Sequence, residues 1–249
     1  MQRLFPQPTQ EIVDPTTIYD DLWQRLPEPP ADRPYVLLNM VTSIDGKAVV
    51  NGSVAGLGSD VDHRLMRALR AAVDAVMVGA GTFRADRVDT KVGADREPQR
   101  AARGLPAEPL GIVLSRSGDL PLDRRFFTGP GGNRLAIVGA GVAPEQRAAL
   151  AARTPLLVTP REAPDPRWVM AQLRHEHGVR HLLVEGGPAL NGELFKADCV
   201  DEICWTLAPK LVGGGEGVTM ITGPALPDLR RCTLVSAYLH EDEWFFRYR

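Results

Sequence analysis

Glu185, Gly186, Gly187 and Pro188 form the stretch of this sequence with the clearest chemical potential. They follow a short apolar run, 182–184, of the kind found in strands buried on both faces. Proline suits the first turn of a helix, and glycines let an anion approach the free N–H groups there. A double glycine alone more often marks a tight turn, but a carboxylate at the tip of a buried strand is costly without a partner. The stretch therefore predicts a phosphate cradle with a carboxylate beside it.

Two other apolar runs end in polar residues that suit ligand binding. Asn39 lies inside the run 35–41, where a core amide bonded to backbone and a side chain pointing into a cleft are equally good interpretations. Ser115 and Arg116 follow the run 111–114. A hydroxyl beside a guanidinium suits a phosphomonoester, although a surface loop is the commoner setting for this pair.

A second glycine-rich turn, residues 79–82, follows the apolar run 75–78. It lacks the third glycine of the G-x-G-x-x-G dinucleotide fingerprint, so the motif alone is a weak signal. Thr82 in this turn could contact a cofactor or simply cap the next helix.

Basic residues that could hold a substrate phosphate occur in two places. The helix predicted to begin near residue 60 carries Arg64, Arg67 and Arg70, most of which a solvated helix face would explain. The loop 87–91 could also supply positive charge.

The elements that must position these residues alternate between strand and helix. Further strands are predicted at 134–138, 155–158 and 202–211, helices at 144–153, 167–176 and from 188, and a closing hairpin at 231–239 and 243–248. This order predicts a three-layer αβα domain over residues 34–249, with a mostly parallel central sheet and antiparallel C-terminal strands. Residues 1–33 are predicted to form an N-terminal arm with one helix over 17–26.

Composition excludes several classes of protein. The chain has 249 residues, 44% of them hydrophobic, and a formal net charge of −2, so no basic surface directs it to nucleic acid or an anionic membrane. No apolar run approaches the roughly 20 residues that span a bilayer. The first residues lack a signal peptide's apolar segment, and the three cysteines form no C-x-x-C pair, so we expect a cytoplasmic protein with no metal site.

Four motifs, in order along the chain, resemble the reductase domain of riboflavin biosynthesis: 38–47, 78–82, 184–190 and 208–214. That family has a dihydrofolate-reductase-like fold and reduces 5-amino-6-(5-phosphoribosylamino)uracil, or its diamino-pyrimidinone precursor, with NADPH. The resemblance covers residues 34–249 and implies a homodimer. Within the family, the chain resembles the stand-alone archaeal and fungal-type members, because Asn39 stands where bifunctional bacterial members have lysine. No zinc deaminase motif is present, so only reduction is expected.

The resemblance also implies site residues. The NADPH contacts would come from Val41, Gly79, Gly81, Thr82, Asp86, Ser115, Arg116, Gly186, Gly187, Pro188, Ala189 and Leu190, with the adenosine 2′-phosphate on Ser115 and Arg116. The substrate contacts would come from Asn39, Ser43, Asp45, Ser53, Arg70 and Glu185, of which Glu185 and Asn39 would be catalytic and Arg70 would hold the ribose phosphate. A pterin reductase on the same fold, or an NADPH-binding regulatory protein with a decayed site, are the alternatives.

Overall fold

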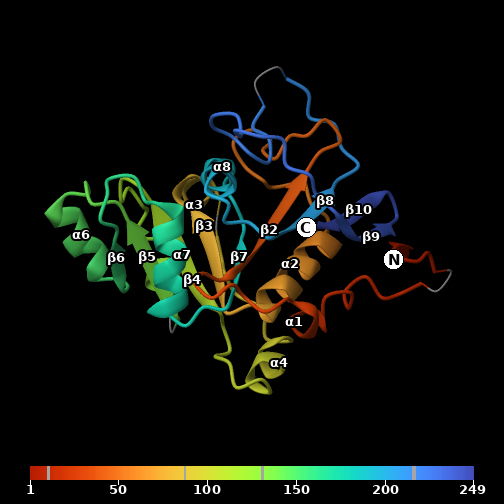
Figure 1. Ribbon diagram of the computed structural model, residues 1–249, viewed down its shortest axis with the longest axis horizontal. Coiled ribbons are helices and arrows are strands. Elements are labelled where there is room, and N and C mark those ends of the chain that lie inside the picture. Colours follow the sequence, from red (N-terminus) through yellow and green to blue (C-terminus); the bar gives the residue numbers. More distant parts are fainter. Residues whose placement is uncertain (10–11, 87, 130–131, 215–216) are drawn as a thin grey trace.

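One mixed sheet runs through the molecule (Figure 1). The computed structural model describes residues 1–9, 12–86, 88–129, 132–214 and 217–249. Its described strands lie in the order β1-β9-β10-β8-β2-β7-β3-β4-β5-β6. Their bounds are β1 Gln2–Phe5, β2 Tyr35–Thr42, β3 Ala75–Gly79, β4 Leu110–Ser115, β5 Arg134–Val138, β6 Leu156–Val158, β7 His181–Val184, β8 Glu202–Leu207, β9 Leu234–His240 and β10 Glu243–Tyr248.

The sheet is parallel from β8 to β6 and antiparallel at the C-terminal strands. β2 pairs in parallel with both β7 and β8, and the parallel pairing continues through β3, β4, β5 and β6. β10 pairs antiparallel with β8 and β9, and β9 with β1. The central strands are buried on both faces, which explains their continuous apolar runs, whereas β8 and β10 alternate between buried and half-buried residues.

Helices cover both faces of this sheet (Figure 1). α7 and α8 pack on one face, where Met170 and Leu194 meet Leu38. α1 and α2 pack on the other, against Leu37, and α3, α5 and α6 cover β3 to β5 with a cluster that includes Phe83. The predicted three-layer αβα architecture is confirmed. The helix bounds are α1 Leu22–Arg25, α2 Asp60–Ala72, α3 Ala80–Ala85, α4 Glu97–Ala101, α5 Arg125–Thr128, α6 Pro144–Ala151, α7 Pro166–His175 and α8 Pro188–Lys196.

Residues 1–33 add more to the sheet than the sequence predicts. The prediction is an arm with a helix over 17–26, whereas the structure has the edge strand β1 and only the short helix α1. The Asp14 carboxylate accepts hydrogen bonds from the backbone N–H and hydroxyl of Thr16, and such local bonds compete with helix formation. Leu22 is fully buried in the core beneath α2, so the arm is packed against the domain.

Two smaller differences concern a strand end and a helix that was not predicted. β8 ends at Leu207, not at residue 211, because Pro209 cannot donate to a ladder. No pattern in the sequence predicted α5, which buries Phe126 and Phe127. In the described part of the chain, no helix is long and apolar enough to cross a membrane, and no group of three or more His, Cys, Asp or Glu side chains could hold a metal ion.

A buried arginine holds the C-terminal end of α2, the helix that carries Arg70. The Arg100 side chain is 1% exposed and donates hydrogen bonds to the backbone oxygens of Arg70, Ala71 and Val73 at 2.6–3.3 Å. The last carbonyls of a helix have few backbone partners: of these three, only that of Arg70 accepts a backbone N–H in the described part of the chain, from Val73, and a cation there also favours the helix dipole. Burial, with repulsion from Arg103, lowers the pKa of Arg100 to about 10.

Replacing Arg100 by methionine is expected to lower the free energy of unfolding by roughly 2–4 kcal/mol, because several buried carbonyls lose a charged donor. Urea unfolding measures this change. Arg64→Met, at an exposed position of α2, is the control and should shift stability by no more than about 0.5 kcal/mol. Equal, small shifts in both variants would contradict the capping role.

Candidate active site

A cavity of about 1450 Å³ lies where the parallel strands end. Its lining includes residues 39–41 of β2, the turn 79–82 after β3, and 185–190 after β7. Because β2, β7 and β3 are neighbours in the sheet, their carboxyl ends bring these three segments together. Three of the four motifs recognised in the sequence therefore meet at one site.

The turn between β7 and α8 has the geometry of an anion cradle. Gly186 has φ of 79°, a conformation that favours glycine, and its carbonyl accepts a hydrogen bond from the N–H of Gly79 at 2.7 Å. Gly187 is the N-cap of α8 and provides no side-chain cap. In the described part of the chain, the N–H groups of Ala189 and Leu190 donate to no protein acceptor. These N–H groups are thus available to an anion in the cavity.

Thr82 faces this cradle. It is the third residue of α3, whose N-cap is Gly79, so its hydroxyl does not cap the helix. A Cβ on Gly187 would lie only 2.6 Å from Thr82 Oγ1. The close approach explains why a glycine suits position 187 and places the hydroxyl at the cavity wall.

Glu185, directly before the cradle, and Arg70 of α2 form a bidentate ion pair in the cavity. Arg70 Nε and Nη2 donate to Glu185 Oε1 and Oε2 at 2.6 and 2.8 Å, and the two side chains are 8% and 9% exposed. Arg70 Nη1 donates to the backbone oxygen of Lys91 at 2.9 Å. The carboxylate at the tip of β7 therefore has the partner that its burial requires.

The pairing changes what Arg70 can do. The sequence prediction assigns it to the ribose phosphate, but its guanidinium is committed to Glu185 and to the 87–91 loop. Burial alone would lower the pKa of Arg70, yet the carboxylates of Glu185, Asp89 and Glu108 raise it above its ordinary value. In the structure Arg70 holds Glu185, and its contact with the ribose phosphate stays a prediction.

Asn39 is exposed to the cavity. Within the described residues, its side chain has no hydrogen-bond partner, and it is half-buried between fully buried neighbours on β2. A core amide would be bonded to backbone, so this placement favours the ligand-facing interpretation over the alternative. Val41, two residues further on the same face of β2, also lines the cavity.

Ser115 and Arg116, at the end of β4, differ in exposure. Arg116 is exposed and lines the cavity. Ser115 is 1% exposed, and its hydroxyl accepts a hydrogen bond from the N–H of Gly118. Of the two residues predicted to take the adenosine 2′-phosphate, only Arg116 is placed to do so.

Ser43 and Asp45 lie outside the cavity lining and join two loops. The buried Ser43 hydroxyl donates to Asp45, whose carboxylate also accepts the N–H groups of Val212 and Gly213. These hydrogen bonds lower the pKa of Asp45 to about 2. In the structure these two side chains bond to each other and to the 212–213 loop, and the predicted substrate contacts from both residues stay predictions.

Ser53 reaches the site indirectly. Its hydroxyl donates to Asp86 Oδ1 at 2.5 Å, and Asp86 lines the cavity. Ser53 itself is absent from the lining of the cavity as far as the chain is described, although its neighbours Gly52 and Val54 contribute to it.

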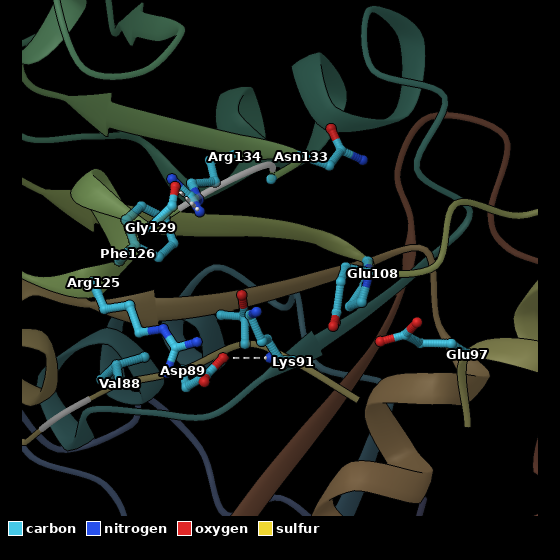
Figure 2. Close-up of a pocket in the computed structure, with 13 residues that line it drawn as sticks. Val88, Asp89, Lys91, Glu97, Glu108, Arg125, Phe126, Gly129, Asn133 and Arg134 are labelled. Atoms are coloured by element: carbon cyan, nitrogen blue, oxygen red, sulfur yellow. Dashed lines mark hydrogen bonds between the residues drawn. The ribbon is translucent and has the colours of Figure 1, made fainter. Parts of the chain in front are cut away.

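A smaller pocket of about 220 Å³ adjoins this cavity and shares four of its lining residues: Val88, Asp89, Lys91 and Arg125. Figure 2 shows Arg125 and Asp89 on one side of it and Glu97 and Glu108 on the other. Lys91 of the loop 87–91 lines the cavity, and the role of this loop in holding a substrate phosphate stays a prediction. Residue 87 lies outside the described residues.

Residues 34–245 match the family described as the RibD C-terminal domain. The chain belongs to this family. A 2,5-diamino-6-ribosylamino-4(3H)-pyrimidinone 5′-phosphate reductase of Archaeoglobus fulgidus is 30% identical over 205 residues, 81% of this chain and 91% of that protein. The reductase of the same name from Methanothermobacter thermautotrophicus is 29% identical over 79% of this chain and 88% of its own length.

Solved structures agree on the fold of the family. A pyrimidine reductase-like protein of Corynebacterium diphtheriae has a TM-score of 0.79 at 22% identity, covering 95% of this chain and 98% of its own. The riboflavin biosynthesis reductase Rib7 of Saccharomyces cerevisiae has a TM-score of 0.66 at 18% identity, covering 92% and 99%. The sequence-based resemblance is confirmed, and this is a reductase family of riboflavin biosynthesis.

Several lining residues were missed from the sequence. Asp62 and Met66 precede Arg70 at four-residue intervals on α2, and all three line the cavity. Helical spacing back from Arg70 was the signal that could have found them. Val169 and Met170 of α7 form the wall beyond the glycine turn, and nothing in the sequence placed α7 there.

Proposed function

We propose that this chain uses NADPH to reduce the ribosyl group of a phosphorylated 5-amino-6-ribosylamino-pyrimidine in riboflavin biosynthesis. The observation that carries the proposal is the meeting of the Glu185–Arg70 ion pair and the free N–H groups of α8 in one cavity. The name of the Archaeoglobus fulgidus and Methanothermobacter thermautotrophicus relatives supports this substrate class. Both 5-amino-6-(5-phosphoribosylamino)uracil and its diamino precursor belong to it.

The residues present fit NADPH. The start of α8 would hold the pyrophosphate, because the N–H groups of Ala189 and Leu190 have no protein acceptor among the described residues. Thr82 would bond beside it, and Val41 would lie against the nicotinamide. Arg116 would take the adenosine 2′-phosphate, the group that distinguishes NADPH from NADH.

The reaction needs a hydride and a proton at an imine. Opening of the ribose ring gives a C1′ imine, which becomes the ribityl amine when C1′ gains the hydride and the nitrogen gains a proton. Bound NADPH supplies the hydride. Asn39 would orient the sugar through its unpartnered amide, and Glu185, fixed by Arg70, would accept a hydrogen bond from the substrate and pass a proton during ring opening.

The proposal is tested by measuring NADPH oxidation from its absorbance. Each ribosylamino-pyrimidine phosphate and dihydrofolate is assayed separately. We expect rapid oxidation with at least one pyrimidine, little with dihydrofolate, and slower reaction when NADH replaces NADPH. The reverse substrate order would identify a pterin reductase. Tight NADPH binding without turnover on any of them would identify a nucleotide-binding regulatory protein.

Two further expectations belong with this proposal. We expect the chain in the cytoplasm, and the resemblance implies a homodimer. Trp205, Trp244 and Phe246 form a half-buried aromatic row on β8 and β10, which a second copy could cover. Sedimentation equilibrium would measure the mass.

A further inference from the structure

The segment 49–58, which connects β2 to α2, forms one wall of the cavity. The residues of this segment that line the cavity are Val49, Gly52, Val54, Ala55 and Gly58. Val54 is 39% exposed although it lines the cavity, and the residues around it, 51–52 and 55–56, are exposed as well. A segment with this much exposed surface is stabilised by few apolar contacts, so its polar contacts decide where it lies.

Ser53 bonds the middle of this wall to the cofactor side of the cavity. Its hydroxyl donates to Asp86 Oδ1 at 2.5 Å and accepts the N–H of Ala55 at 3.0 Å. The N–H of Asp86 donates to the backbone oxygen of Thr82 at 2.9 Å, so Asp86 lies one helical turn beyond Thr82, and both line the cavity. Thr82 faces the start of α8, where a Cβ on Gly187 would meet its hydroxyl. The hydrogen bond from Ser53 to Asp86 therefore joins the wall to the side of the cavity that carries the cradle.

Lys210 fixes the end of the same wall. Its Nζ donates to the backbone oxygens of Gly56 and Leu57, both at 2.7 Å. Lys210 belongs to the motif 208–214, which follows β8 and lies outside the cavity lining as described. Figure 1 shows the segments after β2 and after β8 side by side toward the top of the view. This motif therefore holds the cavity wall.

We infer that Ser53 is a positioning residue that couples the binding of the pyrimidine to the binding of NADPH through Asp86. The inference rests on the proposed function. An ionised carboxylate is an acceptor only, so it would repel the pyrophosphate but accept a hydroxyl of the ribose next to it. It has acceptor positions for about four hydrogen bonds, of which the Ser53 hydroxyl takes one. Asp86 can thus bond the wall and the cofactor at the same time.

The coupling arises because both ligands order the same segment. A pyrimidine that packs on Val54 holds the wall in place, and the wall holds Ser53 and the Asp86 rotamer that NADPH needs. NADPH bound to Asp86 fixes Ser53 and the wall in turn. The ligand that binds second therefore meets a segment that is already ordered, which raises its affinity. Linkage requires that each ligand raises the affinity of the other by the same factor.

The test measures the Kd of NADPH by isothermal titration, with and without a saturating ribitylamino-pyrimidine 5′-phosphate. This product has no imine left to reduce, so no turnover disturbs the measurement. In the wild type we expect the product to lower the Kd roughly 5- to 150-fold, the usual range of coupling between two sites. Ser53→Ala should bring this coupling factor close to one, whereas Ser53→Thr, which keeps the hydroxyl, should retain most of it.

Two further variants complete the test. Thr16→Ala is the matched control, because the Thr16 hydroxyl also donates to a carboxylate, that of Asp14, at 2.7 Å, and neither residue lines the cavity as described. It should leave the coupling factor unchanged. Lys210→Met, which releases the end of the wall, should lower the factor, and it tests the inference where Ser53→Ala folds poorly.

The outcomes separate this inference from the proposed function. A wild-type coupling factor of one, or an undiminished factor in Ser53→Ala and Lys210→Met, would overturn the role of Ser53, while turnover of the pyrimidine leaves the proposed function standing. An equal loss of NADPH affinity with and without the product would show that Ser53 acts on one site alone and would also overturn it. If the wild type neither reduces a ribosylamino-pyrimidine phosphate nor binds the product, the proposed function fails, and this inference with it.

Discussion

Replacing Glu185 by glutamine is expected to lower kcat/KM for the ribosylamino-pyrimidine substrate by roughly 10²- to 10⁴-fold, the range for a positioned acid–base group. Glutamine keeps the shape and one acceptor oxygen of the side chain but cannot take up and return a proton at the substrate. The steady-state rate of NADPH oxidation measures this change. Glu176→Gln, at an exposed position after α7, is the matched control and should retain full activity.

The same substitution also affects stability, and the two effects must be separated. Removing one partner of the buried pair leaves Arg70 without its counter-charge, at a cost on the order of 3 kcal/mol. Removing both charges, in Arg70→Met with Glu185→Gln, should recover part of the free energy of unfolding but none of the activity. Full turnover by a folded Glu185→Gln enzyme would contradict the catalytic role.

Replacing Gly186 by alanine is expected to raise the Kd for NADPH by roughly 10- to 100-fold, because the anion cradle loses hydrogen bonds to a charged group. Gly186 has φ of 79°, and an added Cβ would lie 3.2 Å from Met40 Sδ, so the turn that opens α8 must shift. Isothermal titration measures the affinity.

Gly178→Ala is the matched control for this change. Gly178 has φ of 64° and no atom within 4 Å of an added Cβ, and it lies outside the cavity lining as described. Both variants should lose about 1–2 kcal/mol of stability from the left-handed backbone. Only the Gly186 variant should lose NADPH affinity, and equal affinities would contradict the cradle.

The parts of the site that could be predicted from the sequence are those encoded locally. An apolar strand, a glycine turn and a helical proline lie within one short stretch around Gly186 and Gly187, so their geometry follows from neighbouring residues. Asn39 could be identified as a candidate site residue, but the direction of its side chain could not be predicted. A core amide and a cleft-facing amide both occur within the same apolar run. The alternation of strands and helices along the chain could be predicted for the same reason, because each apolar run that marks a strand is local in the sequence.

The parts that could not be predicted depend on packing between distant segments. Arg70 and Glu185 are 115 residues apart, and their pairing requires the sheet order that sets β7 beside α2. The sequence could not show that Ser115, the last residue of β4, is buried while Arg116 after it lines the cavity. The hydrogen bond from Thr206 to Asp62 spans 144 residues and left no local signal.

The reaction with NADPH deuterated at C4 of the nicotinamide tests the central claim most directly. Mass spectrometry of the pyrimidine product should show a ribityl group with one deuterium at C1′. The account would be contradicted if the pyrimidine kept an unreduced, unlabelled ribosyl group while dihydrofolate took up the deuterium.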